Sequence, residues 1–217
     1  TTGGRIIFSV NCIGGVLKDM DKTMLDSLDA TIRQMEKDFA VIEETFLGEY
    51  TVHSRLKGLG VLEPGQAVLA GAVGPMLRAS GIPYDARLLG YGAYPHLDVK
   101  PIARTEGDSY ARCEVRLAEI RQSFALIRQA IGQIPDGAIS VPVKGFPKEN
   151  ISCGSSSPGG SHLLCEGKWN QIHRPLPPAH PHHQQHPAHA GYAEGCQLAD
   201  VPLLILTIDP CISCTER

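Results

Sequence analysis

The segment GDSYARCEVRLAEIRQSFALIRQAI, residues 107–131, decides how this 217-residue chain folds. Apolar side chains recur in it every three or four positions, which is the period of one helix face. Asp108 can cap the start, and Pro135 ends the pattern because proline cannot continue a helix. The sequence therefore predicts a long amphipathic helix between these two residues. Its apolar face comprises Tyr110, Cys113, Leu117, Ile120, Phe124, Ile127, Ile131 and Ile134.

A second helix of the same kind precedes it. Asp21 is a good N-cap and Gly48 a good stop, and the apolar residues between them are again spaced by three and four. They are Leu25, Leu28, Ile32, Met35, Phe39, Ile42 and Phe46. Two long helices with matching apolar faces are expected to pack against each other or against a common neighbour.

Shorter elements surround these helices. We expect a short helix within residues 50–62, turns at 64–65 and 74–75 around another helix, and an irregular loop over 81–101. Strands are predicted at 3–10 and 138–143, and the apolar run 201–208 is expected to be buried in whichever state it adopts. The predicted fold is mainly α with a small β portion.

Composition excludes some functions. With 20 Lys and Arg against 23 Asp and Glu, the net charge is −3, so there is no electrostatic case for binding nucleic acid. No apolar run reaches the roughly 18–20 residues that a membrane-spanning helix requires. The chain is expected to have no transmembrane segment of its own.

The stretch 209–217, DPCISCTER, carries the clearest chemistry. Cys211 and Cys214 stand three positions apart, so their thiolates can bind one soft metal centre such as Ni, Fe or Zn. A thiol redox pair, half of a zinc or iron–sulfur site, and a structurally idle pair are the alternatives for such a motif. A redox pair needs a helix directly after it to lower a thiol pKa, and only three residues follow Cys214.

Several segments together resemble one family. The C-terminal motif is similar to the nickel-binding end of the large subunit of energy-converting, group 4 type [NiFe] hydrogenases, which are relatives of the 49 kDa (or D) subunit of NADH-quinone oxidoreductase. GPMLRASG at 74–81, followed by Asp85 and Arg87, resembles a segment of both branches, as do 107–123 and 199–202. The two cysteines favour the hydrogenase branch, because the resemblance implies that the quinone-reducing subunits lack them.

The resemblance implies roles and partners. Cys211 would be a terminal nickel thiolate and the proton acceptor in H2 cleavage, and Cys214 would bridge Ni to an Fe that carries CO and cyanide. The fold would be the long-helix bundle of this family, acting with an iron–sulfur small subunit and membrane-arm subunits. The expected location is cytoplasmic, peripheral on the inner face of the cell membrane through these partners.

Two further thiolates are missing. The family takes them from another CxxC near the N-terminus of the large subunit, and the cysteines outside 211–214 stand singly here. We therefore expect this chain to be the C-terminal portion of a larger subunit that cannot hold the Ni–Fe centre alone. Cys113, on an apolar helix face, is expected to be a buried structural thiol.

Four other residues are candidates for supporting roles. Arg78 and Ser80 belong to the motif shared by both branches, and the alternative for Arg78 is a pair with a carboxylate such as Asp85 that braces a loop. Asp209 is expected to orient the cysteine turn through backbone hydrogen bonds, and Arg217 to form a salt bridge.

Residues 151–194 differ from both flanking parts, 1–150 and 195–217. Seven of the nine histidines lie between His162 and His189. Codons permitted by residues 162–170, read one base later, spell Thr-Tyr-Phe-Val-Lys-Gly-Asn-Gly, a strand and turn typical of the family. We interpret 151–194 as a frame-shifted segment without a stable core.

Two other functions stay open. A quinone-reducing respiratory subunit would carry Cys211 and Cys214 without using them. A non-catalytic metal-binding module would combine the two cysteines with the histidines. Metal analysis distinguishes the three cases.

Overall fold

The computed structural model describes residues 14–143 and 195–207 with their side chains. It describes the backbone alone for 11–12, 150–156, 161–168 and 171–175. The predicted strand 3–10 lies outside these residues. The fold is mainly helical with a small β portion, as predicted.

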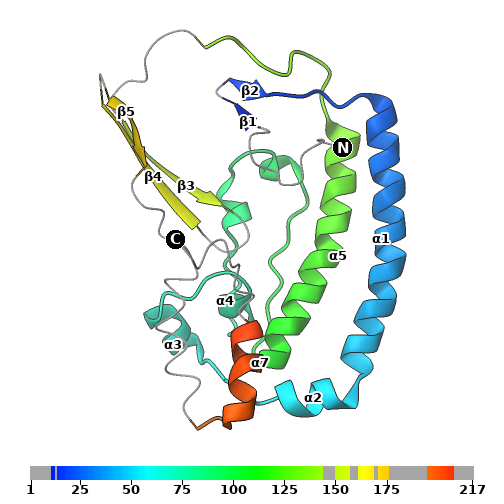
Figure 1. The fold of residues 1–217 in the computed structure, drawn as a ribbon, viewed down its shortest axis with the longest axis vertical. Helices are drawn as coiled ribbons and strands as arrows, with labels where there is room; N and C mark the ends of the chain where they lie inside the picture. Colours follow the sequence, from blue (N-terminus) through cyan, green and yellow to red (C-terminus); the bar gives the residue numbers. More distant parts are fainter. Residues whose placement is uncertain are drawn as a thin grey trace.

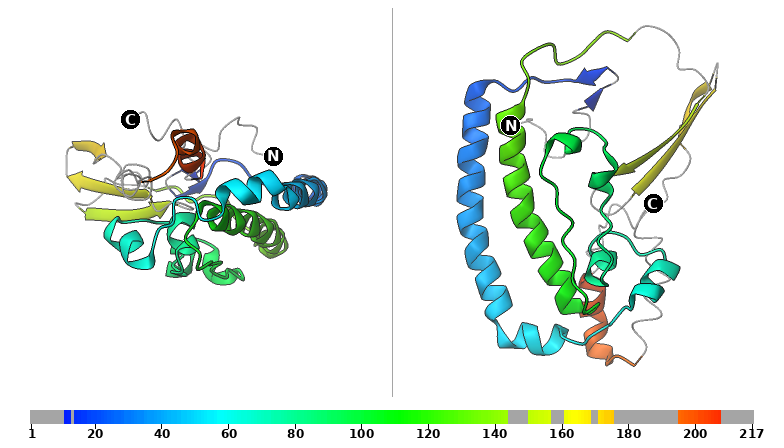
Figure 2. Two further views of the ribbon diagram at one scale, coloured as in Figure 1. Left: turned by 90° about the horizontal axis from the view of Figure 1, so that it is seen from below. Right: turned by 180° about the vertical axis from the view of Figure 1, so that it is seen from behind.

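Two long antiparallel helices, α1 (Lys22–Gly48) and α5 (Ser109–Gln133), form the frame of the molecule and lie side by side (Figures 1 and 2). Both predicted caps are present. Asp21 accepts a hydrogen bond from the Met24 amide at 2.8 Å, and Asp108 accepts one from the Ala111 amide at 2.8 Å. These contacts satisfy amide groups that the first helical turn leaves without partners.

The predicted packing of the two long helices is confirmed. The rings of Phe39 and Phe124 meet edge to face with their centroids 5.8 Å apart. The most deeply buried face of α5 is a different one, however, because it includes Arg112 and Glu119 besides Val115. An apolar pattern cannot identify a buried face that carries charged side chains. On α1 the predicted face is only half covered, since Ile42 is 60% exposed.

Short helices close the lower end of the frame. They are α2 (Tyr50–Leu56), α3 (Pro64–Leu69) and α4 (Pro75–Ala79), followed by the 3-10 turns η1 (Ala86–Leu89) and η2 (Tyr94–His96). Pro64 and Pro75, predicted to mark turns, are instead the first residues of α3 and α4. That position tolerates proline because its amide would have no helical partner.

The apolar run near the C-terminus is a helix, α7 (Val201–Leu206), which follows the 3-10 turn η3 (Leu198–Asp200). Leu204 is 1% exposed and joins the main core. The other buried members of that core are Leu62, Ala67, Ala72, Met76 and Leu77. The expectation that the whole run is buried is wrong, because Ile205 and Leu206 are 47% and 68% exposed. A helix distributes successive side chains around its axis, so one contact face cannot cover them all.

The β structure is small. Strands β1 (Asn11–Cys12) and β2 (Gly15–Val16) pair antiparallel, and the predicted strand 138–143 contributes only one bridge, between Gly15 and Ser140. A second antiparallel sheet has the order β3 (Asn150–Ser156), β4 (Ser161–Lys168), β5 (Gln171–Pro175). It stands apart from α1 and α5 (Figures 1 and 2). The interpretation of 151–194 as frame-shifted stays a prediction.

Candidate functional site

The predicted metal ligands follow α7 directly in the sequence. Asp209, Cys211, Cys214 and Arg217 lie outside the described residues, and the last described residue is Thr207. Within the part of the chain whose side chains are described, no group of three or more His, Cys, Asp or Glu side chains could hold a metal ion. The end of α7 is therefore the part of the candidate site that the structure describes.

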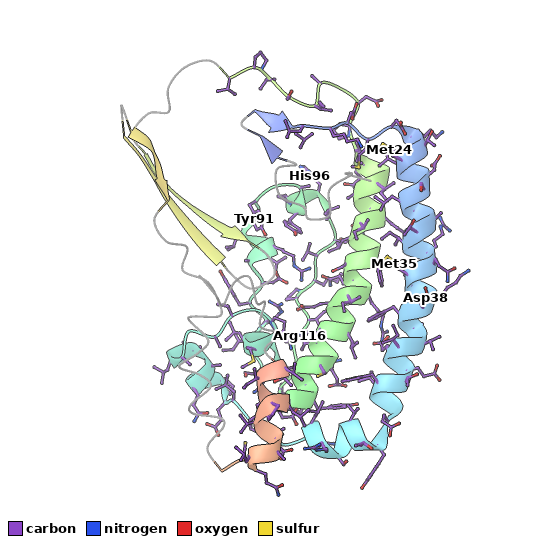
Figure 3. The ribbon with its side chains drawn as sticks, in the orientation of Figure 1. Met24, Met35, Asp38, Tyr91, His96 and Arg116 are labelled. Carbon is purple, nitrogen blue, oxygen red and sulfur yellow. The ribbon has the colours of Figure 1, made fainter. Side chains whose placement is uncertain are left out.

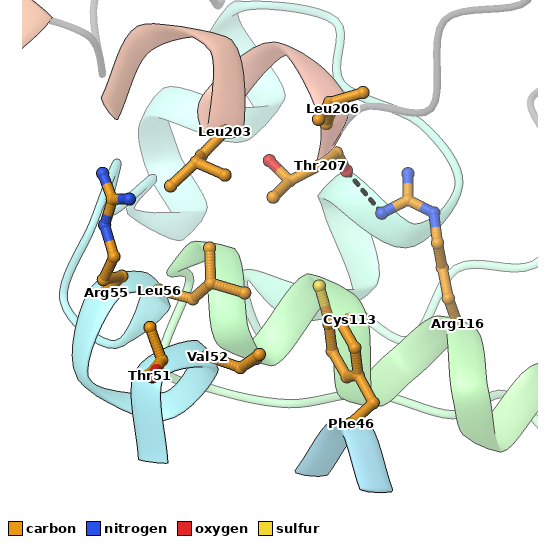
Figure 4. Close-up of a pocket in the computed structure, with 10 residues that line it drawn as sticks. All are labelled: Phe46, Thr51, Val52, Arg55, Leu56, Cys113, Arg116, Leu203, Leu206 and Thr207. Carbon is orange, nitrogen blue, oxygen red and sulfur yellow. Dashed lines mark hydrogen bonds between the residues drawn. The ribbon is translucent and has the colours of Figure 1, made fainter. Parts of the chain in front are cut away.

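Two arginines one helical turn apart on α5 converge on Thr207. Arg116, which is labelled in Figure 3, donates from Nη1 to the Thr207 carbonyl (Figure 4). Nη1 of Arg112 lies 3.4 Å from the Thr207 hydroxyl. Thr207 is 5% exposed. Its hydroxyl donates to the Leu204 carbonyl at 2.7 Å, and its amide donates to the Leu203 carbonyl at 3.0 Å. Every polar group of Thr207 is thus in a hydrogen bond.

Arg112 is fully buried and joins separate segments. Its Nη2 donates to the carbonyls of Gly60 and, at 2.9 Å, Gly107, and its Nη1 lies 3.4 Å from the Ser109 hydroxyl. Gly107 has φ of 68°, and a Cβ there would stand 2.5 Å from the Leu62 carbonyl oxygen. Only glycine fits this close approach. Gly107 and Arg112 together therefore fix the conformation of the loop before α5.

A cavity of about 520 Å³ lies between α2, α5 and α7, next to the contact of Arg116 with Thr207 (Figure 4). Its walls are mainly apolar, with Phe46, Leu56 and Leu203 among them, and Cys113 projects into it. Burial raises the pKa of the Cys113 thiol, and the charges of Arg116 and Arg112 offset this only in part. Cys113 is thus a half-buried thiol that lines the cavity, so the prediction of a buried structural thiol is met only in part.

The start of α7 has its own tether at the opposite side of the cavity. Arg55 of α2 pairs with Asp200 at 2.5 Å. The Arg55 side chain is 47% exposed, so this pair is partly screened by water.

Arg78 and Ser80, two further predicted site residues, are buried and stabilise their surroundings through hydrogen bonds. Nε of Arg78 donates to Glu119 of α5 at 2.5 Å, and its Nη1 donates to the Tyr84 carbonyl at 3.0 Å. Ser80 is fully buried and donates to the Met76 carbonyl at 3.1 Å. The predicted pairing of Arg78 with a carboxylate is confirmed, but its partner is Glu119 and not Asp85, the carboxylate suggested from the sequence.

Asp85 instead pairs with Arg87, through Nε at 3.0 Å and Nη2 at 2.5 Å. Burial raises the pKa of Asp85, but the hydrogen bonds and the charge of Arg87 outweigh it and hold that pKa below its usual value. The shared motif at 74–87 therefore forms two buried ion pairs, one to α5 and one within its own loop.

Sequence reasoning did not single out the residues that anchor α7. Arg112 and Arg116 are part of the 107–123 motif, but Thr207 ends an apolar run and has no distinctive signal of its own. Two arginines four positions apart, beside the apolar stripe of a helix, were the available indication of a buried cationic contact.

Known proteins of similar sequence point to one family. Residues 1–156 match the family described as "Respiratory-chain NADH dehydrogenase, 49 Kd subunit". The membrane-bound hydrogenase subunit alpha of Pyrococcus furiosus is 32% identical over 100% of this chain and 55% of its own length. The carbon monoxide-induced hydrogenase of Rhodospirillum rubrum is 34% identical over 99% of the chain and 61% of its own length.

A respiratory relative matches a smaller part. The C/D subunit of NADH-quinone oxidoreductase from Bacteroides fragilis is 39% identical over 66% of the chain and 27% of its own length. Among solved structures, the membrane-bound sulfane sulfur reductase, an archaeal respiratory membrane complex, contains a similar chain with a TM-score of 0.83 and 26% identity. That match covers 94% of this chain and 58% of the other. The chain thus spans little more than half the length of the hydrogenase relatives it matches.

Proposed function

This chain belongs to the family of the 49 kDa subunit of respiratory-chain NADH dehydrogenase, and from that premise we propose that it is the C-terminal portion of an energy-converting [NiFe] hydrogenase large subunit. In the complete subunit it would supply two of four thiolates to the Ni–Fe centre. The reaction would be reversible H2 oxidation and proton reduction, coupled to electron transfer through an iron–sulfur small subunit.

The extent of the matches carries this proposal. The two hydrogenases align with 100% and 99% of the chain, whereas the NADH-quinone oxidoreductase relative aligns with 66%. The cysteine motif at 209–217 also lies outside residues 1–156, the part that matches the 49 kDa subunit family. This pattern favours the hydrogenase branch over the quinone-reducing branch.

The chemistry of the cysteine pair fits the group. Thiolates are the ligands that soft metals such as nickel prefer, and Cys211 and Cys214 are close enough in sequence to bind one centre. When bound, the Ni–Fe group supplies the centre at which H2 is split or formed. Cys211 would hold the transferred proton on its Sγ atom, because a metal-bound thiolate is a base beside the reacting hydrogen. The other two ligands would come from a part of the large subunit that this sequence does not include.

The proposed setting is a membrane complex. Among the residues that the structure describes, every helix is too short or too polar to cross a bilayer. We propose that the large subunit lies on the cytoplasmic side of the cell membrane and is held there by membrane-arm subunits. The similar chain in the archaeal respiratory membrane complex supports this arrangement.

Metal analysis of the complete subunit, purified with its partners, tests the function. We expect nickel and iron in equal amounts with infrared bands of CO and cyanide, and loss of nickel in Cys211→Ser. Cys196→Ala is the matched control, since this half-buried thiol packs against the main core, and it should keep its nickel. Zinc alone would support the metal-binding module. Quinone reduction without bound metal would support the respiratory subunit.

We also propose that residues 151–194 result from a reading-frame error in the gene sequence. The concentration of histidine between 162 and 189 supports it, because Thr and Asn codons rich in C and A become His and Pro codons when shifted. Resequencing the gene decides the matter. An intact frame that encodes the histidines contradicts the proposal.

A further inference from the structure

We propose that the cavity between α2, α5 and α7 is an interface with the rest of the large subunit, and that apolar side chains from outside this chain fill it. This inference rests on the proposed function, because it requires the chain to be one portion of a larger subunit. It requires neither nickel nor the cysteine pair. The apolar walls that support it are Phe46, Val52, Leu56, Leu203 and Leu206 (Figure 4).

The cavity is larger than the voids that remain in a packed protein interior. Its volume is about 520 Å³. An engineered apolar cavity of about 150 Å³ already has room for benzene. Native interiors contain few voids larger than a water molecule, because their side chains interdigitate. A space with room for several apolar side chains is therefore expected to be occupied in the complete subunit.

Exposed apolar side chains lie at and beside the mouth of the cavity. Leu206 lines the cavity and is 68% exposed. Ile42 precedes Phe46 by one turn on the same face of α1 and is 60% exposed. Exposed apolar surface around a concave centre is typical of an interaction site. The cavity and its rim therefore form one apolar surface that a partner can cover.

The described walls offer few polar partners to water. Arg55 and Arg116 line the cavity, and both contact the segment that contains α7, through Asp200 and Thr207. A water molecule held inside a protein makes about three hydrogen bonds, which leucine, valine and phenylalanine walls cannot provide. Apolar side chains fit this space better than ordered water does.

The rest of the subunit is the occupant that the lengths of the relatives favour. The match covers 55% and 61% of the two hydrogenases and 58% of the similar chain in the archaeal complex. A large part of each relative lies outside it. Parts of one chain that pack together bury a substantial common interface. Because they are covalently joined, each meets the other at an effective concentration of about millimolar, which gives the rest of the subunit an advantage over a second copy or a free lipid.

Photo-crosslinking in the complete subunit, purified with its partners, identifies the occupant. Leu206→p-benzoylphenylalanine places a photoreactive group at the mouth of the cavity, and mass spectrometry identifies the linked peptide after irradiation. We expect a peptide from the part of the large subunit outside residues 1–217. Links only to a partner subunit, a second copy, a lipid or residues 1–217 contradict the inference, and so does the absence of any link.

Alkylation of Cys113 by iodoacetamide, in the same complete subunit, measures whether the cavity is filled, since this thiol projects into it. Leu206→Asp places a charge against the apolar occupant, so we expect the rate at Cys113 to rise by about fivefold or more. Leu206→Met keeps the apolar contact and should match the wild type. The matched control is Leu69→Asp, the same change at a side chain of α3 that is 90% exposed and is not a wall of the cavity. It should leave the rate at Cys113 unchanged.

Two alkylation results overturn the inference: an unchanged rate at Cys113 in Leu206→Asp, or an equal rise in Leu69→Asp. The first would mean that nothing covers Leu206, and the second that the added charge acts through the whole fold. Neither the cross-link nor the alkylation rate depends on bound metal. A complete subunit without nickel would therefore refute the proposed function and still leave both measurements decisive.

Discussion

The two halves of α5 use arginine in opposite ways. In the first half Arg112 is fully buried against carbonyl and hydroxyl oxygens, and Glu119 receives the buried Arg78. In the second half Arg121 and Arg128 pair with Glu43 and Glu36 of α1, and the arginine side chains are 62% and 35% exposed, although the Glu43 side chain is only 11% exposed. The first half of α5 thus contacts a polar interior, and the second half pairs with α1 through arginines that are partly exposed to water.

This difference in burial indicates which charged residues stabilise the fold. Exposed ion pairs contribute about 0–1 kcal/mol each, because water screens them and the side chains lose freedom. Losing one partner of a buried pair costs about 3–5 kcal/mol, because it leaves a charge without compensation. The first half of α5 should therefore depend on its charged residues, and the second half on packing such as Phe39 against Phe124.

The largest effect is expected from Arg78→Met, which leaves the carboxylate of Glu119 buried without its cation. We predict a loss of about 4 kcal/mol in the free energy of unfolding. A lower denaturation midpoint of the complete subunit would measure it. Adding Glu119→Leu should recover much of the loss, since an apolar pair can replace a buried ion pair. No recovery in the double variant would contradict this account.

Arg112→Met should follow, with a loss of about 3 kcal/mol, because it removes the charged donor to the buried Gly60 carbonyl and one of the two donors to the Gly107 carbonyl, which also accepts from the Leu62 amide. Hydrogen exchange of the amides in 58–62 and 201–207 should increase together, since Arg112 joins these segments. An increase confined to one segment would show that Arg112 does not couple them.

A smaller, pH-dependent effect is expected at Asp85. The pKa of Asp85 is lower in the folded state than its usual value of 3.8, so its contribution is present at neutral pH and is lost as the pH falls below that value. Asp85→Asn should therefore reduce stability at pH 7 and flatten its decline in acid. Denaturation midpoints at pH 7 and pH 3 measure this. An equal difference between variant and wild type at both pH values would contradict the prediction.

The smallest effect on stability is expected for the exposed ion pairs between α5 and α1. Arg128→Gln should change stability by less than about 1 kcal/mol, because its side chain and that of Glu36 are 35% and 34% exposed, and the change should shrink further at high salt. Chemical denaturation at low and high ionic strength tests this. A loss as large as that of Arg112→Met would remove the contrast between the two halves of α5.

The sequence predicted what depends on neighbouring residues. The limits of α1 and α5 and the caps at Asp21 and Asp108 are local features, and all were found where expected. The contact between Arg112 and Thr207 joins residues 95 positions apart, and no local pattern announces it. The buried face of α5 was missed for a related reason, since Arg112 and Glu119 resemble solvent-facing residues until their partners are known.

The position of Leu204 in the core has a consequence for how the chain is made. Its partners in that core, including Leu62 and Met76, are synthesised long before it. The core around them stays open until α7 has left the ribosome, so a nascent chain halted before residue 201 should present an uncovered apolar surface to chaperones. In the finished chain, the helix that closes this core is the same one whose last residue precedes the cysteine motif.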